Sequence, residues 1–220
     1  MIRKQTTFIL GAGASVPYGF PTGLKLTEEI FNNLREIKNS KDKVQSTQLA
    51  KLVYSSFTYN DIVDFYRLFL GAGAESIDSF LEQRTEFIQL GKILIAYNIL
   101  EHENQILDST SNFLPGFENK DHWYRYLWQF LKAEATLDTF KGNRLIIVTF
   151  NYDRSFEYYF QLVISNLFRI PLEAAFEMLQ ESIKIIHLHG SVGNLYNIKE
   201  PNFVPFGMPN FNEQHHCRFE

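Results

Sequence analysis

Three short apolar stretches, far apart in the chain, predict the strands of an α/β fold. Residues 5–10, 144–150 and 183–188 are rich in apolar and β-branched side chains and are too short for typical helices. The middle stretch is apolar almost throughout, which predicts a parallel strand covered on both faces. Each stretch ends in polar or glycine-rich residues. Because the carboxyl ends of parallel strands lie at one edge of an open sheet, where ligands bind, we expect these three ends to meet.

The chain between the first two strands has the periodicity of helices. Apolar side chains at helical spacing predict helices over 24–37, 49–57 and 62–70, and one long helical pattern from Ser76 to about Ile99. A further helix is predicted over 121–135, and its expected apolar face consists of Trp123, Tyr126, Leu127, Phe130 and Leu131.

This helical content determines the predicted architecture. A crossover between neighbouring parallel strands needs only about a dozen residues or somewhat more, and the helical region here is far longer. We therefore predict a Rossmann-like parallel sheet formed by residues 1–23 and 143–220, with a large helical insertion over about 24–142. Helices over 154–168 and 172–181 are expected to connect the second and third strands.

The first strand leads into Gly11-Ala12-Gly13-Ala14-Ser15. A strand, a tight turn and a helix in that order bring backbone N–H groups and a helix dipole to a phosphate group. A dinucleotide fingerprint would have a third glycine where this chain has Val16. Taken alone, the loop leaves phosphate binding and a simple turn equally open.

Two other turns are predicted from their residues. Thr22 is placed to cap the next helix. The string Gly71-Ala72-Gly73-Ala74, which is similar to the glycine loop, follows a helical pattern that we expect it to end.

Composition excludes several classes of function. The 220 residues carry a net charge of −4, so there is no basic excess to replace phosphate counterions, which argues against direct nucleic-acid binding. The single cysteine, Cys217, excludes a disulfide framework and a zinc ribbon built from cysteine pairs. No apolar run has the length of a membrane span, and the N-terminal run is too short for a signal peptide. We expect a cytoplasmic protein without a membrane partner.

The other two strands end in Asn151-Tyr152-Asp153 and His189-Gly190-Ser191. Asn151 and Asp153 have two interpretations, because such residues also commonly cap a helix, here the one that begins near Arg154. His187 and His189 are two residues apart and share a face if the strand reaches both. No third ligand at suggestive spacing accompanies them, so we interpret His187 as a hydrogen-bonded structural residue. His215-His216-Cys217 is a weaker candidate metal site.

These three strand ends, in this order, resemble the sirtuin (SIR2) family of NAD-dependent enzymes. Further strings are similar to the SIR2-like domains of bacterial anti-phage defence proteins, which hydrolyse NAD and do not deacylate proteins. They are Gly19-Phe20-Pro21-Thr22-Gly23, Ser76-Ile77-Asp78-Ser79-Phe80-Leu81, Thr149-Phe150-Asn151-Tyr152-Asp153 and Val204-Pro205-Phe206-Gly207. The resemblance spans nearly the whole chain.

The resemblance implies a role for each candidate residue. Asn151 would orient the ribose and the attacking water, and His189 would be the general base, since a histidine exchanges protons near neutral pH. Asp153 would hold the nicotinamide carboxamide. The remaining cofactor-binding residues would be Gly11, Ala12, Gly13, Ser15, Gly190 and Ser191. NAD would be the substrate, and no metal would be needed.

The function implied by the resemblance is hydrolysis of NAD+ to ADP-ribose and nicotinamide, in an anti-phage effector that depletes NAD. A homo-oligomer is expected, with a second defence-system protein or a phage trigger as partner. The alternatives are a non-catalytic sensor of NAD or ADP-ribose and a protein deacylase. The deacylase is disfavoured because sirtuin deacylases carry a zinc ribbon with two cysteine pairs and place Asp-Phe-Arg where this chain has Thr22-Gly23-Leu24. Family members continue beyond the His-Gly strand, so C-terminal strands are expected to be missing here or supplied by another chain.

Overall fold

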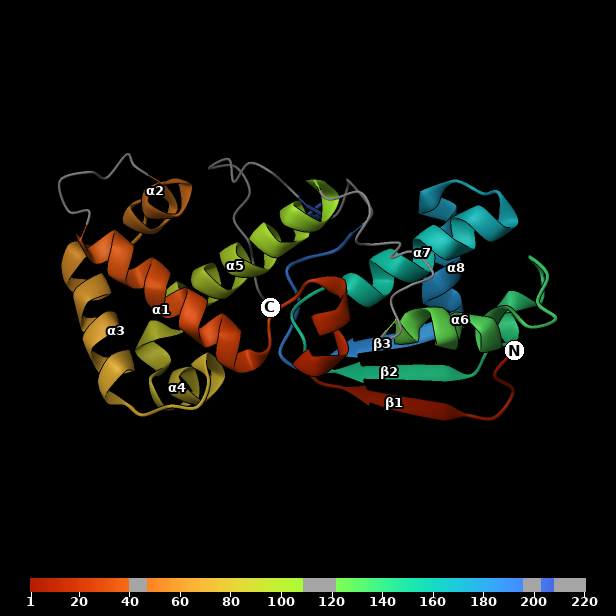
Figure 1. Ribbon diagram of the computed structural model, residues 1–220, viewed down its shortest axis with the longest axis horizontal. Coiled ribbons are helices and arrows are strands. Elements are labelled where there is room, and N and C mark those ends of the chain that lie inside the picture. Colours follow the sequence, from red (N-terminus) through yellow and green to blue (C-terminus); the bar gives the residue numbers. More distant parts are fainter. Residues whose placement is uncertain (40–46, 109–121, 196–202, 208–220) are drawn as a thin grey trace.

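The computed structural model describes residues 1–39, 47–108, 122–195 and 203–207. The molecule is elongated, with a helical half beside a half that contains the sheet (Figure 1). The helical half contains α1 (Gly23–Asn39), α2 (Gln48–Tyr54), α3 (Tyr59–Gly71), α4 (Ile77–Gln83) and α5 (Ile88–Asp108). The sheet half contains β1 (Thr6–Leu10), β2 (Leu145–Thr149), β3 (Ile183–His187), α6 (Trp123–Lys132), α7 (Ser155–Phe168) and α8 (Leu172–Ser182).

The sheet in the described ranges has three parallel strands in the order β1-β2-β3. Its register places Leu10, Thr149 and His187 side by side in one row at the carboxyl ends of the strands. All three arrows in Figure 1 point toward the helical half, so this edge of the sheet faces the helices. The predicted α/β class with a parallel sheet is therefore confirmed, and the arrangement is consistent with a Rossmann-like fold.

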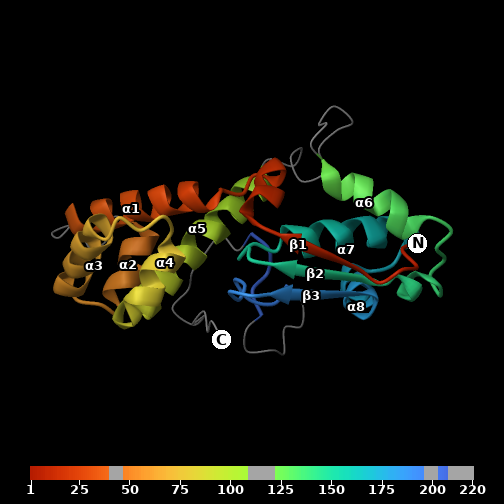
Figure 2. The ribbon, with the colours of Figure 1, turned by 90° about the horizontal axis from the view of Figure 1, so that it is seen from below.

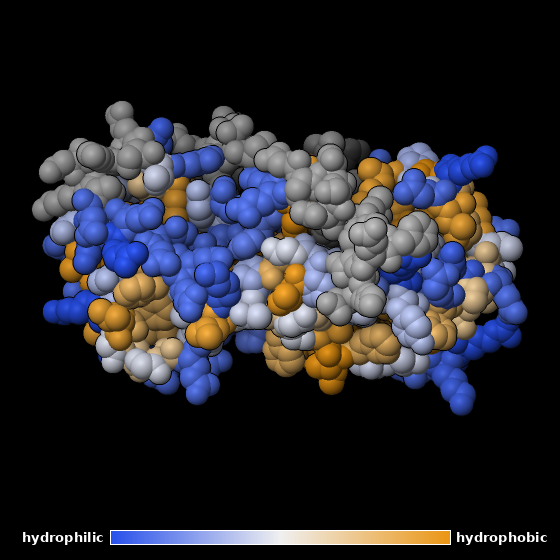
Figure 3. Space-filling model, viewed as in Figure 1, coloured by the Kyte–Doolittle hydropathy of each residue, from blue (hydrophilic) through white to orange (hydrophobic). Residues whose placement is uncertain are grey.

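The two faces of the sheet are covered unequally. Helices α6, α7 and α8 lie on the same side of the strands, and Figure 2 shows the strands from the other side. Ile147 of β2 is buried, whereas Ile146 and Val148, which point to the other face, are only half-buried. Ile9 of β1, in register with Val148, is 72% exposed, and apolar side chains reach the surface over the sheet half (Figure 3). The prediction of a strand covered on both faces is wrong, because an apolar run does not specify where the helices pack.

The long helical pattern that begins at Ser76 is interrupted in the structure. Helix α4 ends at Gln83, Arg84 leaves the helical conformation, and a short 3₁₀ turn, η3 (Thr85–Phe87), precedes α5. The rings of Phe80 and Phe87, one on each side of the break, lie with their centroids 6.0 Å apart in the same core. Because both segments bury apolar side chains against this core, their hydrophobic pattern continues across the break.

Helix α6 buries a face that matches the predicted one only in part, because Leu127 and Leu131 are buried as expected. Tyr126 is 70% exposed and Phe130 is 50% exposed, so their predicted burial is wrong. The buried side chains are Tyr124, Leu127, Trp128 and Leu131. Most positions of this helix are apolar or aromatic, and the face that packs against α7 was therefore not specified by spacing alone. Figure 1 also shows α6 beside α7 over the sheet, away from helices α1–α5.

Two predictions about turns are confirmed. The backbone N–H of Lys25 donates to Thr22 Oγ1 at 3.3 Å, so Thr22 caps the beginning of α1. Helix α3 ends at Gly71, and Gly73 adopts a left-handed φ of +58° two residues later. The glycine string at 71–74 is thus a helix terminator.

A buried ion pair joins the two halves of the molecule. Arg154, immediately before α7, donates from Nη2 to Glu103 Oε2 at 2.6 Å and from Nε to Oε1 at 3.1 Å. Glu103 lies on α5, and both side chains are almost completely inaccessible to solvent. Burial raises the pKa of Glu103, and the guanidinium of Arg154 opposes that rise. The pair is bidentate, which is the strongest geometry for an arginine and a carboxylate.

The same ion pair holds the described C-terminal segment. Arg154 donates to the carbonyl oxygens of Gly193 and Val204, and Glu103 accepts from the backbone N–H of Gly207 at 3.0 Å. Gly207 has a φ of +65°, and a Cβ atom there would lie 2.1 Å from Leu107 Cδ1. The left-handed φ and this close approach both favour glycine, the last residue of the Val204-Pro205-Phe206-Gly207 string.

We expect Glu103→Leu to lower the free energy of unfolding by about 3–5 kcal/mol, because it leaves the buried guanidinium of Arg154 without its counter-charge. The double variant Glu103→Leu with Arg154→Met is expected to recover part of that loss, since no buried charge is then left unpaired. Urea denaturation measures both effects.

Arg67→Met is the matched control, because its ion pair with Asp64 is exposed to solvent and is expected to contribute less than about 1 kcal/mol. A double variant less stable than Glu103→Leu would contradict the account of the buried pair.

Candidate functional site

The glycine loop that follows β1 does not lead into an α-helix. It forms two 3₁₀ turns, η1 (Ala12–Ala14) and η2 (Val16–Tyr18), and α1 begins only at Gly23. Pro17 lacks a backbone N–H, and Gly19 has a φ of +90°, so the chain cannot continue as a helix here. The helix after the first strand therefore begins near the predicted residue 24, and the glycine loop itself lacks the dipole of an α-helix.

Ser15, at the end of the loop, meets the Asn151-Tyr152-Asp153 turn in a buried polar cluster. The Nδ2 group of Asn151 donates to Ser15 Oγ at 2.9 Å, and Ser15 Oγ donates to Asp153 Oδ1 at 3.1 Å. All three side chains are buried. The structure thus brings together three predicted site residues, of which Ser15 is about 140 positions away from the other two in the sequence.

Ser155 and Tyr124 complete this cluster, and neither was predicted. Asp153 Oδ1 accepts from the hydroxyl of Ser155 and from its backbone N–H, the latter at 3.1 Å. The hydroxyls of Tyr124 and Ser155 are 2.8 Å apart. Burial raises the pKa of Asp153, and the hydrogen bonds from Ser155 and Ser15 oppose that rise. Asp153 thus accepts from the first backbone N–H of α7, but it is not the N-cap residue, which is Arg154 and makes no side-chain cap hydrogen bond.

One atom of the cluster lacks a partner. Asn151 Oδ1 is buried and has no hydrogen-bond partner among the described residues. It lines a cavity of about 10 Å³ together with polar side chains that include Ser15, Thr149 and Asp153. That volume is close to the minimum for one water molecule. A ligand larger than water would have to reach Asn151 from the outer surface of the cluster.

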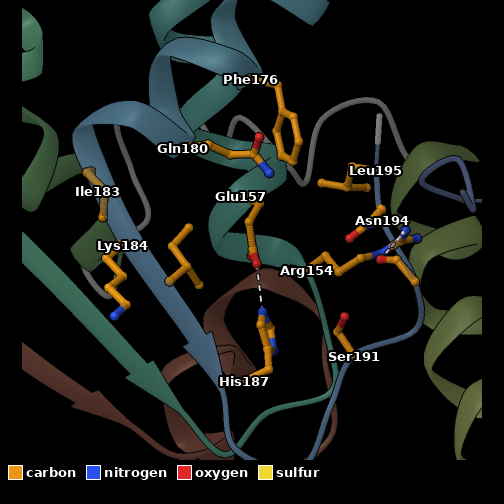
Figure 4. A pocket seen from close by; sticks show the side chains of 12 residues that line it. Arg154, Glu157, Phe176, Gln180, Ile183, Lys184, His187, Ser191, Asn194 and Leu195 are labelled. Carbon is orange, nitrogen blue, oxygen red and sulfur yellow. Dashed lines mark hydrogen bonds and ion pairs between the residues drawn. The ribbon is translucent and has the colours of Figure 1, made fainter. Parts of the chain in front are cut away.

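His187 bridges the cluster to helix α7. Its Nδ1 lies 2.8 Å from the main-chain oxygen of Asn151, and its Nε2 lies 2.7 Å from Glu157 Oε1. Burial alone would lower the pKa of His187, but the Glu157 carboxylate, the hydrogen bond to Asn151 and the charge of Asp153 together raise it to about 9. Figure 4 shows His187 and Glu157 pointing toward each other on one wall of a pocket of about 290 Å³. The interpretation of His187 as a hydrogen-bonded residue is confirmed.

His189 is separated from this buried layer. Strand β3 ends at His187 and does not reach His189, so the condition for the two histidines to share a strand face is not met. His189 is exposed, and its ring centroid lies 5.7 Å from that of Phe150 and 6.2 Å from that of Tyr152. It lines a second pocket, of about 210 Å³, together with side chains of α4 and α5 such as Asp78 and Lys92. This pocket lies between the two halves of the molecule.

The remaining predicted residues lie around the buried cluster. Gly11 and Gly13 are exposed, and Ala12 is half-buried. Gly190 and Ser191 are half-buried, and Ser191 lines the pocket that contains His187. The predicted site therefore has a buried layer formed by Ser15, Asn151 and Asp153, and an exposed rim formed by the glycine loop and His189.

A side-chain contact also connects the Asn151-Tyr152-Asp153 turn to the helical half. The hydroxyl of Tyr152 donates to Asp78 on α4, and burial is the first reason that the pKa of Tyr152 is raised. Ser76 caps α4 by accepting from the backbone N–H of Ser79 at 3.2 Å. The Ser76–Leu81 string thus starts a helix and presents Asp78 to the edge of the sheet.

Sequence reasoning missed several residues of the site. Tyr124 was indistinguishable from core aromatics, and Glu157 from any polar residue early in a helix. Asp153 offered a signal for the bond to Ser155, because an aspartate side chain commonly accepts from the backbone N–H two residues further on.

No group of three or more histidine, cysteine, aspartate or glutamate side chains in the described ranges is arranged to hold a metal ion. The His215-His216-Cys217 string lies outside these ranges. None of the helices in the part of the chain that the structure describes is both long and apolar enough to cross a membrane. Comparisons with protein-family models, with curated proteins and with solved structures give no match for this chain.

The His187–Glu157 pair predicts a pH dependence of stability. Because the pKa of His187 rises from 6.5 to about 9 on folding, its protonation stabilises the fold fully below about pH 6.5, and this contribution is lost as the pH rises through about 9. We therefore expect His187→Gln to lower the free energy of unfolding more at about pH 6 than at about pH 9.5. Urea denaturation at the two pH values measures the difference. An equal loss at both would contradict a raised pKa.

Proposed function

We propose that this protein hydrolyses NAD+ to ADP-ribose and nicotinamide. The observation that carries the proposal is the meeting of Ser15, Asn151 and Asp153 at the carboxyl edge of the sheet, where Asn151 Oδ1 is left as an unpaired buried acceptor. This edge is where open parallel sheets bind their ligands. The choice of NAD as the ligand rests on the resemblance of the three strand ends to SIR2-like domains.

The glycine loop supports the proposal through the space above it. A Cβ atom at Gly11 or Gly13 would meet no atom within 4 Å, and neither glycine has a left-handed φ. In contrast, the backbone conformation of Gly19 and of Gly207 favours glycine. The fold therefore does not require glycine at positions 11 and 13. Glycine would instead be required there by a ligand that approaches the backbone closely, as a pyrophosphate does.

The exposed rim and the buried layer of the site would have different roles in the reaction. A water oxygen attacks the ribose carbon that carries nicotinamide, the bond between this carbon and the pyridine nitrogen breaks, and nicotinamide leaves as a neutral molecule. His189 on the exposed rim would take the proton from the water. Asn151 would act from the buried layer, through Oδ1, on the attacking water, because the cavity beside it has room for about one water molecule.

The pocket beside His189 is suited to the leaving group. Its volume is about 210 Å³, which is smaller than a pocket for a whole drug-sized ligand, at roughly 300–1,000 Å³. Leu81, Ile88 and Ile95 give it apolar walls, and Asp78 and Tyr152 give it polar groups. A single aromatic ring with a carboxamide fits that combination. The rest of the dinucleotide would extend across the exposed glycine loop.

The biological role is proposed from the resemblance alone. The protein would deplete NAD as an anti-phage effector in the cytoplasm, as a homo-oligomer activated by a second defence protein or a phage component. A non-catalytic sensor of NAD or ADP-ribose is the second candidate. It is favoured by the burial of Asn151 and Asp153, which keeps both side chains away from bulk water. A sensor would bind NAD in calorimetry without releasing nicotinamide.

We expect the protein to release nicotinamide from NAD+, and both Asn151→Ala and His189→Ala to lower the rate by at least about 100-fold, the usual range for loss of a general base or an orienting group. Chromatography of nicotinamide measures the reaction. Leu188→Ala is the control beside His189, because this side chain is exposed and has no proposed role. Full activity in both site variants would show that the assignment of Asn151 and His189 is wrong.

The two similar glycine strings provide a matched pair of variants for binding. We expect Gly11→Ala to weaken NAD binding at least about tenfold, because its methyl group occupies the space of the pyrophosphate, without lowering stability. Gly71→Ala, which also meets no atom within 4 Å, is expected to leave binding unchanged. Calorimetry with NAD+ and thermal denaturation test both variants. Equal affinity in the two would exclude the glycine loop as the phosphate site.

A further inference from the structure

Every polar group of Asn151 except one is used to hold the residue in place. Its backbone N–H donates to Thr149 Oγ1 at 3.0 Å, its Nδ2 donates to Ser15 Oγ, and its main-chain oxygen lies 2.8 Å from His187 Nδ1. The remaining group is Oδ1, for which the described part of the chain provides no hydrogen-bond partner. The orientation of that oxygen is therefore determined by the hydrogen bonds of the other three groups.

Among these partners, His187 is the one whose side chain forms hydrogen bonds through both of its ring nitrogens. A carbonyl oxygen only accepts hydrogen bonds, so the Nδ1 atom that faces Asn151 must carry a proton. The Nε2 atom faces the Glu157 carboxylate at 2.7 Å, a length typical of a charge-assisted hydrogen bond. The ring therefore donates from both nitrogens, one bond to the turn and one to α7.

We propose that His187 and Glu157 form a positioning pair, which fixes the main chain of Asn151 and so aims its Oδ1 at the substrate. Glu157 lies in the first turn of α7, and His187 is the last residue of β3, in the same row as Thr149. The pair thus connects the helix, the strand and the Asn151 turn at one point. This inference rests on the proposed hydrolysis of NAD only where its test measures enzyme kinetics.

Other charged groups around the pair are few and identifiable. Asp153, in the same turn as Asn151, adds a negative charge that favours the protonated ring. Arg154 and Lys184 line the same pocket (Figure 4), and the guanidinium of Arg154 is neutralised by Glu103. Glu157 is the carboxylate in hydrogen-bond contact with His187. Substitution of Glu157 is therefore the most direct way to break the hydrogen bond that holds the ring of His187.

The chain provides a matched control pair. His102 on α5 and Glu29 on α1 form a second histidine–glutamate contact, with Nε2 and Oε2 2.9 Å apart, inside the helical half. Glu29→Gln makes the same chemical change as Glu157→Gln at a place that does not touch the site. Any effect specific to Glu157→Gln is then due to its position.

The kinetic test compares Glu157→Gln and His187→Phe with Glu29→Gln, per folded molecule and at a temperature where all variants are folded. Misplacement of a catalytic group lowers the rate of the chemical step more than binding, so we expect kcat to fall about 10- to 100-fold while KM changes less than about twofold. Glu29→Gln is expected to change neither. Unchanged kcat for Glu157→Gln, or a change in KM alone, would overturn the positioning role.

The pH profile gives a readout that loss of stability does not mimic. In the wild type, kcat should fall as the pH rises through about 9, where His187 loses its proton. In Glu157→Gln the fall should occur at lower pH, because the carboxylate no longer favours the protonated ring. An identical profile for the two proteins would contradict the proposal.

A measurement without turnover separates this inference from the proposed function. In protein labelled with ¹⁵N at asparagine, the side-chain amide resonance of Asn151, assigned by its absence in Asn151→Ala, should shift in Glu157→Gln and not in Glu29→Gln. If the wild type releases no nicotinamide, the proposed hydrolysis is wrong, and the positioning role is decided by this resonance alone. A resonance that moves supports the role, and one that does not move overturns it.

Discussion

The buried ion pair of Arg154 and Glu103 holds α5 of the helical half against the beginning of α7 in the sheet half. Two charges taken out of water are costly, so the pair is tolerated only because its geometry is bidentate and its remaining atoms bind backbone groups. Those backbone groups belong to Gly193, Val204 and Gly207, so one contact orients α5, α7 and the described C-terminal segment together. The pocket that contains His189 lies between the same two halves.

The carboxyl edge of the sheet is organised by the need to satisfy buried polar groups. The three strands end in one row, which places Thr149 and His187 next to the Asn151 turn, and the glycine loop adds Ser15 from the first strand. Buried donors and acceptors are expensive to leave unpaired, so almost every one of them holds another in place. Asn151 Oδ1 is the exception within the cluster, and such exceptions are frequent where a ligand or a water completes the site.

Helix α6 shows how the aromatic residues contribute to this edge. The indole N–H of Trp123 donates to the main-chain oxygen of Ala14 at 2.8 Å, and the hydroxyl of Tyr124 contacts Ser155. The ring of Tyr124 stacks on that of Tyr18, with centroids 3.8 Å apart. Rings with one polar atom can fill a core and still reach a buried hydrogen-bond partner. The glycine loop and the Asn151 turn are thus held in place by aromatic side chains of α6.

The sequence by itself determined the strands, most helices and the order in which polar turns follow strands, because these depend on local periodicity and on turn residues such as Thr22 and Gly71. It also identified Ser15, Asn151 and Asp153 as candidates, which the structure brings into one cluster. Only the tertiary structure decided that His189 lies on the exposed rim and that His187 pairs with Glu157, since where a strand ends and which helix faces it depend on packing. The covered face of the sheet and the partner of Arg154 were undetermined for the same reason. Contacts between residues far apart in the chain leave no periodic trace in the sequence.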